Sequence, residues 1–207
     1  MESKEENVTE LEGLAEEIAD CTKCLLHRAR RHAVPGEGPT DADIMFVGEG
    51  PGFHEDQQGR PFVGAAGAFL EELLDSIGLK RRDVFITNVV KCRPPGNRDP
   101  LPEEIESCRP YLDRQIELLS PTVVVTLGRF SMARAFPNAR ISQVHGKPKK
   151  INGVVYYPMY HPAAALHRPS LRGTVEQDVR RIPEVVKQAP RMAESDPPPQ
   201  ADQLELF

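Results

Sequence analysis

Short apolar segments alternate with amphipathic segments through most of this chain of 207 residues. The apolar segments are continuous, which is typical of buried strands, and the segments between them carry apolar residues at helical spacing. Uninterrupted apolar strands separated by helices indicate a parallel sheet with helices on both faces. We therefore expect an α/β fold, a three-layer α/β/α sandwich with a short, mostly parallel central sheet. The predicted strands span residues 44–47, 84–90, 122–127 and 154–159, and the predicted helices span residues 8–20, 64–77, 102–119, 131–136 and 174–188.

Conspicuous polar residues follow three of the predicted strands. The first strand runs into the glycine-rich segment GEGPG at 48–52, Asn88 lies near the end of the second strand, and His161 follows the last. In parallel sheets, ligands bind beyond the carboxyl ends of the strands. We therefore expect Glu49, Asn88 and His161 to meet at one edge of the sheet.

The four cysteines are Cys21, Cys24, Cys92 and Cys108. The acidic N-terminus has no apolar stretch typical of a secretory signal, so we expect a cytoplasmic protein with reduced cysteines. Zinc ribbons usually carry two CxxC pairs, whereas this chain has one pair and two separate cysteines. The spacing therefore favours an iron–sulfur cluster over zinc, with zinc and unrelated buried cysteines as alternatives.

The formal net charge of −5 is an average over unlike segments. The first twenty residues sum to −7 and the last sixteen to −4, whereas residues 140–191 carry ten bases and three acids and sum to +7. A basic segment of this kind indicates contact with a polyanion, and a solvated basic helix is the alternative. No apolar run approaches the roughly 20 residues of a membrane span, so we expect no membrane segment.

Four segments stand in a characteristic order: GEGPG at 48–52, GRPFVGAAG at 59–67, TNVVKC at 87–92 and YHPAAALHRP at 160–169. Together with the cysteine pattern, they resemble the family 4 uracil-DNA glycosylases of bacteria and archaea, over about residues 21–188. The resemblance implies the sandwich fold of uracil-DNA glycosylases and one [4Fe-4S] cluster. It also implies a monofunctional enzyme that flips uracil out of single- or double-stranded DNA and hydrolyses its N-glycosidic bond, which starts base excision repair.

The resemblance also assigns roles to residues of the predicted site. Glu49 would position the attacking water and stabilise the sugar cation, and His161 would donate a hydrogen bond to uracil O2 as negative charge develops. Gly48 and Gly50 let the backbone approach the nucleotide closely. Asn88 carries a donor and an acceptor that suit O4 and N3–H of uracil.

Further contacts to the base and to the DNA follow from the same resemblance. Phe62 would stack on the flipped base, and Glu55 would crowd C5 and so exclude thymine. The family is usually acidic across 53–56, and Phe53 and His54 depart from that pattern. Leu166 would be the wedge that fills the vacated stack, and Arg168 and Arg172 would contact phosphates. The four cluster ligands would be Cys21, Cys24, Cys92 and Cys108.

Two relatives of this family differ at positions that this chain allows us to compare. One binds uracil-DNA covalently through a histidine on an inserted basic loop, whereas the stretch after Cys92, RPPGNRDPLPEE, has neither the histidine nor the insertion. The other lacks the acidic residue that Glu49 supplies here. We therefore expect ordinary turnover.

The C-terminal peptide QLELF resembles the short peptides with which bacterial repair proteins bind the replication sliding clamp. We expect a glycosylase domain over residues 1–190 and a flexible, proline-rich tail over residues 191–207 that serves as a tether. A tail packed on the body of the protein is the alternative. We also expect a monomer, associated with the nucleoid. The residues predicted to contact the clamp are Gln203, Leu204, Leu206 and Phe207.

Two other functions compete with the glycosylase. A non-catalytic nucleic-acid-binding module with an iron–sulfur or zinc site would need no residues at the sheet edge, so Glu49 and His161 together favour the enzyme. A metal-dependent hydrolase would use His145, His161 and Glu49 as ligands. It is the least favoured hypothesis, because the chain has no paired histidines such as HxxxH near the acid.

Overall fold

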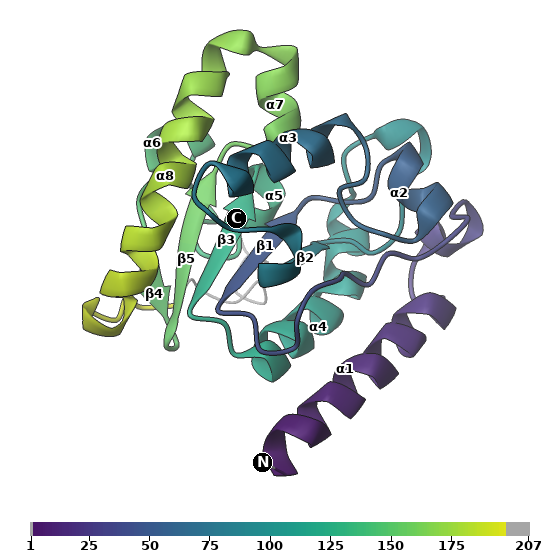
Figure 1. Ribbon diagram of the computed structural model, residues 1–207. Helices are drawn as coiled ribbons and strands as arrows, with labels where there is room; N and C mark the ends of the chain where they lie inside the picture. Colours follow the sequence, from purple (N-terminus) through teal and green to yellow (C-terminus); the bar gives the residue numbers. More distant parts are fainter. Residues whose placement is uncertain (1, 198–207) are drawn as a thin grey trace, which may run out of the picture.

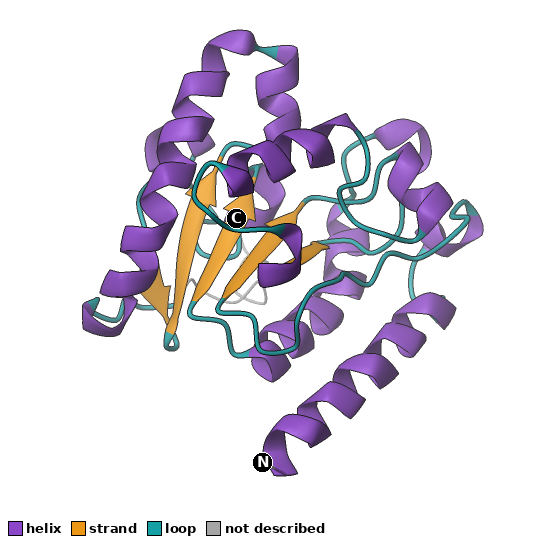
Figure 2. Cartoon of the chain, viewed as in Figure 1, coloured by secondary structure: helices purple, strands orange, loops and turns teal. Residues whose placement is uncertain are grey.

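The structure, a computed structural model, describes residues 2–197, so the predicted clamp peptide Gln203–Phe207 lies outside the described residues. Its centre is a five-stranded sheet with the strand order β2-β1-β3-β5-β4 (Figure 2). Four strands are parallel, and the short edge strand β4 runs antiparallel to β5. The strands are β1 (Ile44–Gly48), β2 (Phe85–Asn88), β3 (Val123–Leu127), β4 (Lys149–Ile151) and β5 (Val154–Met159).

Helices cover both faces of this sheet, because alternate residues of each strand point to opposite sides. Met45 and Val47 pack with α1 and α4, whereas Ile44 and Phe46 pack with α3 and α8 on the other face. Figure 1 shows the resulting three layers. The predicted α/β sandwich is therefore confirmed. The helices that form the outer layers are α1 (Glu2–Asp20), α3 (Ala65–Asp75), α4 (Pro102–Leu119) and α8 (Arg172–Gln188).

Shorter helices connect the layers, and most of them follow a strand or close a loop. The α-helices among them are α2 (Phe53–Gln58), α5 (Arg129–Met132), α6 (Ile141–Val144) and α7 (Pro162–His167). The 3-10 turns are η1 (Leu25–Arg28), η2 (Arg81–Asp83), η3 (Pro95–Asn97), η4 (Pro169–Leu171) and η5 (Ala189–Arg191).

Most predicted elements match the observed ones to within two residues, but the helix expected at 8–20 begins at Glu2. The helix expected at 131–136 begins at Arg129 and ends at Met132, and the strand expected at 84–90 ends at Asn88. The sequence did not indicate α2, α6, α7 or β4. Helices of four to six residues are too short to display a helical period, and β4 has two lysines among its three residues.

The chain beyond α8 still contacts the sheet. The backbone N–H of Ser195 donates to the carbonyl of Lys150 at 2.9 Å, and Gly153 N–H donates to the Glu194 carboxylate at 3.1 Å. A boundary at residue 190 therefore stays a prediction. Among the described residues, no helix combines the length and apolar character that crossing a bilayer requires.

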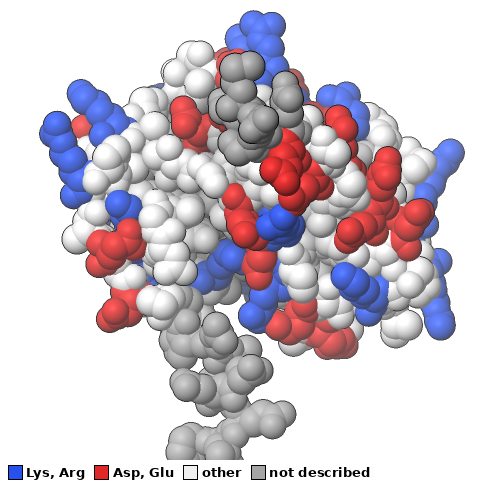
Figure 3. Space-filling view, turned by 90° about the horizontal axis from the view of Figure 1, so that it is seen from below, with Lys and Arg blue, Asp and Glu red and all other residues white. Residues whose placement is uncertain are grey.

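Charged side chains of both signs are interspersed on the face seen from below (Figure 3). Two bases of the predicted basic segment are also paired with acids outside residues 140–191. Arg172 lies 2.9 Å from Glu72, and Lys150 lies 3.7 Å from Glu194. The sum of +7 for residues 140–191 therefore overstates the charge that this segment can present to a ligand.

Candidate active site

The carboxyl ends of the parallel strands bring the predicted site residues together. Gly48 at the end of β1 pairs in register with Asn88 at the end of β2. A Cβ atom on Gly48 would lie 2.3 Å from Oδ1 of Asn88 and 2.7 Å from Cζ of Phe62. Only glycine fits at this position, and its absent side chain lets Asn88 and Phe62 approach one another.

Glu49 lies directly after β1, and its carboxylate points to the loop after β3. Oε1 accepts a hydrogen bond of 3.0 Å from the backbone N–H of Arg129. Burial raises the pKa of Glu49 above its ordinary value, and the backbone bonds from Phe130 and Arg129 oppose that shift only in part. A carboxylate held by backbone donors in a poorly solvated site can stabilise a nearby cation strongly.

His161 follows β5 and caps α7. Its Nδ1 accepts a hydrogen bond of 3.1 Å from the backbone N–H of Ala163, so Nδ1 carries no proton. Burial lowers the pKa of His161 to about 4, and the negative charge of Glu55 opposes this shift. The residue as a whole is half-buried. At neutral pH the ring is therefore a neutral imidazole with its proton on Nε2, ready to donate a hydrogen bond.

Phe62 and Asn88 provide a flat surface and a pair of polar atoms beside that imidazole. The Phe62 ring lies against the His161 ring, with centroids 5.5 Å apart and planes inclined by 22°. Asn88 is only 2% exposed, and its Oδ1 is buried without a hydrogen-bond partner among the described residues. An unsatisfied buried acceptor is costly, and it therefore indicates a ligand that brings a donor to this position.

Glu55 joins two loops of the site. One carboxylate oxygen accepts from the backbone N–H groups of Val63 at 2.9 Å and Gly64 at 3.0 Å, and the other accepts from Gly52 at 3.1 Å. The carboxylate thus braces the glycine-rich loop against the loop that carries Phe62. Its predicted role against the C5 methyl of thymine stays a prediction.

The predicted DNA contacts lie on α7 and just after it. Leu166 is 44% exposed, as a wedge residue must be. Arg168 is exposed, whereas Arg172 donates to Glu72 at 2.9 Å and to Glu176 at 3.0 Å and covers the ring of Phe69. The two arginines therefore differ in how readily they can turn to a phosphate.

Comparison with known proteins agrees with this geometry. Residues 35–182 match the model of the uracil DNA glycosylase superfamily. The type-4 uracil-DNA glycosylase of Sulfurisphaera tokodaii is 51% identical over 185 residues, which cover 84% of this chain and 84% of that protein. The type-4 enzyme of Saccharolobus solfataricus is 47% identical over 87% of this chain and 88% of its own length, and that of Thermotoga maritima is 43% identical over 86% and 95%. This chain belongs to the type-4 uracil-DNA glycosylases. The resemblance seen in the motifs is thereby confirmed.

The four cysteines that a type-4 glycosylase would use for a cluster line one cavity near the end of α1. Three backbone or side-chain N–H groups point at their sulfur atoms, from Lys23 to Cys21 at 3.5 Å, from Arg30 to Cys92 at 3.1 Å and from Lys91 to Cys108 at 3.3 Å. Such donors favour thiolate over thiol, but burial outweighs them and raises the pKa of Cys92 and Cys108 in the absence of a metal.

The described cysteine side chains do not stand in the arrangement of a single-ion site. Tetrahedral zinc bound to four thiolates would need sulfur atoms about 3.8 Å apart, given Zn–S bonds of about 2.3 Å. No group of three or more His, Cys, Asp or Glu side chains in residues 2–197 is arranged to hold one metal ion. The same finding disfavours the metal-dependent hydrolase, whose predicted ligand His145 instead pairs with Asp178 at 2.8 Å.

Two residues of the glycosylase site were missed in the sequence. Gly128 follows β3 with φ +92°, and a Cβ there would lie 2.3 Å from Oε1 of Glu49. Lys91 is 1% exposed, and its ammonium donates to Thr87 Oγ1, the Asn88 carbonyl and Gln115 Oε1 at 2.6 to 2.8 Å. Burial lowers the pKa of Lys91 to about 7. The sequence signals that could have indicated these residues were a glycine at the end of a predicted strand, for Gly128, and a lysine directly after an apolar run, for Lys91.

Proposed function

We propose that this protein excises uracil from DNA by hydrolysing the N-glycosidic bond, and that it thereby starts base excision repair. The observation that carries the proposal is that three groups meet at one sheet edge. They are a neutral His161 with its proton on Nε2, the unpartnered Oδ1 of Asn88 and the partly buried carboxylate of Glu49. Excision of an anionic base requires these three kinds of group: a donor, a reader of the base edge and an anion.

Asn88 supports the choice of uracil over cytosine. Its Oδ1 would accept from N3–H of a flipped uracil, and its Nδ2 would donate to O4. Cytosine presents an acceptor at N3 and a donor at the 4-position, so both contacts would become repulsive. The base would stack on Phe62, and Glu55 would lie on the side of the C5 position.

The chemistry divides between His161 and Glu49. As the C1′–N1 bond breaks, its electron pair goes to the base, and Nε2–H of His161 stabilises the charge that develops on O2. The carboxylate of Glu49 stabilises the sugar cation and orients a water. The water adds its oxygen to C1′, and its proton passes to Glu49 and then to solvent.

Leu166 and Arg168 support action on duplex DNA as well as on single strands. The exposed Leu166 would fill the space that the flipped nucleotide leaves, and Arg168 would contact a neighbouring phosphate. Arg172 would join it only by exchanging an ion pair with Glu72 or Glu176 for one with DNA.

The cysteine cavity supports one [4Fe-4S] cluster, held by Cys21, Cys24, Cys92 and Cys108. Four thiolates and N–H donors to sulfur suit such a cluster. When bound, it would cross-link the chain after α1, the loop after β2 and α4. We assign it a structural role in holding the loop next to Asn88.

The C-terminal peptide supports a second contact, with the replication sliding clamp. Gln203, Leu204, Leu206 and Phe207 match the peptide chemistry that fills an apolar clamp pocket, and the proline-rich segment before them would act as the tether. We propose a monomer that acts at the nucleoid in the cytoplasm. A pull-down with and without residues 203–207 tests the clamp contact: equal capture of both forms would contradict it.

The activity itself is tested with uracil-containing oligonucleotides in EDTA, followed by cleavage of abasic sites with alkali. We expect strand breaks at uracil on single and double strands, and none at cytosine or thymine. Glu49→Ala and His161→Ala should each abolish most of the activity, whereas His167→Ala, an exposed histidine of the same helix, should leave it unchanged. A wild-type protein that binds DNA without releasing uracil would favour the non-catalytic module.

A further inference from the structure

The loop that carries Phe62 has an unusual backbone. Phe62 is 5% exposed and has φ +51°, in the left-handed region that bulky residues rarely adopt. Glycine would adopt this conformation at no steric cost. The surroundings must therefore hold the backbone of Phe62 in this conformation.

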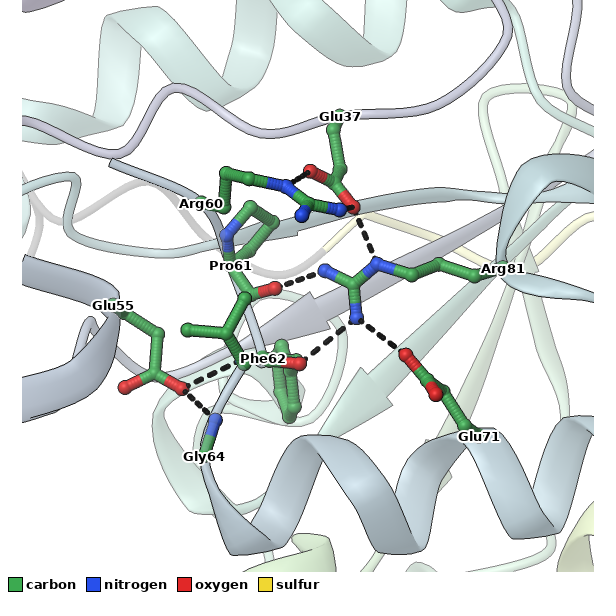
Figure 4. Close-up of polar contacts among 9 residues, drawn as sticks. Glu37, Glu55, Arg60, Pro61, Phe62, Gly64, Glu71 and Arg81 are labelled. Carbon is green, nitrogen blue, oxygen red and sulfur yellow. Dashed lines mark hydrogen bonds and ion pairs between the residues drawn. The ribbon is translucent and has the colours of Figure 1, made fainter. Parts of the chain in front are cut away.

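Glu55 binds the amides that follow Phe62, and Arg81 binds the carbonyls of Phe62 and of the residue before it. The guanidinium of Arg81 donates to the carbonyl of Phe62 at 2.8 Å and to the carbonyl of Pro61, as Figure 4 shows. The side chain of Arg81 is only 15% exposed. Two donors in a rigid plane fix the orientation of two successive peptide groups, which a single point charge could not do.

Glu37 holds Arg81 in turn. Its carboxylate accepts from Nε of Arg81 and from Nε of Arg60, the latter at 2.8 Å (Figure 4). Burial alone would raise the pKa of Glu37, but the bonds from Arg60 and Arg81 outweigh it and lower that pKa. The ion pair therefore stays charged at neutral pH.

Glu37 itself is fixed on the edge strand of the sheet. Its N–H donates to the Ile86 carbonyl at 3.0 Å, and Ile86 N–H donates back at 2.8 Å. The glycines on either side permit this close approach, because a Cβ on Gly38 would lie 2.3 Å from the Val84 carbonyl and one on Gly36 would lie 2.9 Å from that of Ile86. A continuous path thus runs from β2 through Glu37 and Arg81 to Phe62.

We propose that Arg81, held by Glu37, is a positioning residue for the uracil pocket: it fixes the left-handed backbone of Phe62 and thereby the ring that faces His161. The inference rests on the proposed function, because the ring has a task only if a base stacks on it. Arg81 itself touches neither the base nor the sugar.

A double-mutant cycle separates this role from a general contribution to folding. Arg81→Met should lower single-turnover kcat/KM about 100-fold, the order of loss that follows from a misplaced contact group. In a Phe62→Ala background the same substitution should cost no more than about twofold, because its effect passes through the ring. An equal loss in both backgrounds would overturn the proposal.

Arg60→Met is the matched control, since it removes the other cation from Glu37 without touching the carbonyls of the loop. It should leave kcat/KM within about twofold of the wild type. Arg81→Lys keeps the charge but replaces the two planar donor nitrogens by a single ammonium nitrogen, so it should recover part of the loss. Complete recovery would show that the fork of two donors is not needed.

Hydrogen exchange tests the same proposal without catalysis. Backbone amides of residues 59–67 should exchange about tenfold faster in Arg81→Met than in the wild type or in Arg60→Met, with α4 unchanged as the internal reference. Unchanged exchange at 59–67, or an equal rise throughout the chain, would contradict the positioning role. A wild type that releases no uracil would defeat the proposed function, and the exchange measurement would still decide whether Arg81 holds the loop.

Discussion

Gly128 and Glu49 fit together only because residue 128 has no side chain. A Cβ on Gly128 would lie 2.3 Å from Oε1 of Glu49, and φ of +92° at Gly128 is itself unfavourable for other residues. The Gly128 N–H donates to the Met159 carbonyl at 2.9 Å, which ties the end of β3 to the end of β5. The loop after β3 therefore sets where the carboxylate can lie, although it carries no residue that reacts.

Gly128→Ala should lower kcat/KM about 100-fold, because the new methyl group displaces the carboxylate from its backbone donors. Gly153→Ala is the matched control. Gly153 also has a positive φ, +82°, but nothing lies within 4 Å of a Cβ there. Gly153→Ala should lower the free energy of unfolding by about 1 kcal/mol, through backbone strain alone, and should leave kcat/KM unchanged. Equal activity of the two variants would contradict the packing argument.

The pH dependence of kcat/KM should follow the ionisation of Glu49. Burial raises the pKa of Glu49 above its ordinary value of 4.5, and the mechanism needs the carboxylate. Activity should therefore be full at neutral pH and fall as the pH drops through that raised pKa. Glu49→Gln should remove this acid limb from the residual activity, measured by single turnover. An unchanged limb in that variant would assign it to another group.

His161 should stay neutral well below the pH at which exposed histidines titrate. Its pKa is lowered from 6.5 to about 4, so the unfolded chain binds a proton before the folded one does. The stability that this group contributes is present above pH 6.5 and is lost as the pH falls toward 4. Long-range ¹H–¹⁵N NMR should show the Nε2–H tautomer, and His161→Gln should flatten the pH dependence of unfolding between these values. A ring that titrates near 6.5 in the folded protein would contradict the prediction.

Much of the site could be predicted because it lies at strand ends. Glu49, Asn88 and His161 each follow an apolar run, and a parallel sheet brings such ends together whatever the loops do. The motif residues 59–67 added Phe62. These features are local in sequence, so they were visible without coordinates.

The missed features depend on contacts between distant segments. Gly128 makes room for the Glu49 carboxylate only because β1 lies beside β3. The sequence around Gly128 does not indicate that Glu49 is its neighbour. Arg172 was predicted as a phosphate contact, and its hydrogen bond to Glu72, which lies 100 residues earlier, was not visible in the sequence. Arg81 acts on carbonyl groups of residues 61 and 62, which a sequence pattern does not distinguish from any others.

The cysteine site should load iron and sulfide. Protein purified without oxygen should hold about four iron atoms and four labile sulfides per chain and absorb visible light, as expected for a [4Fe-4S] cluster. Cys108→Ser should lose the cluster and lower the melting temperature. Ser107→Ala, at a residue that lines the same cavity without being a proposed ligand, should keep it. One zinc per chain and no iron would favour the zinc alternative.

Arg168 and Arg172 should differ in the salt dependence of DNA binding, although they lie only four residues apart. Arg168 is exposed, whereas the guanidinium of Arg172 is paired with Glu72 and Glu176. Each phosphate contact contributes about one to the slope of log K against log salt concentration, so Arg168→Ala should reduce that slope by about one. Arg172→Ala should reduce it by less, since binding by Arg172 must first break an ion pair. Fluorescence anisotropy with a duplex at several salt concentrations measures both slopes. A larger change in Arg172→Ala than in Arg168→Ala would show that DNA displaces these carboxylates and that Arg172 is the stronger phosphate contact.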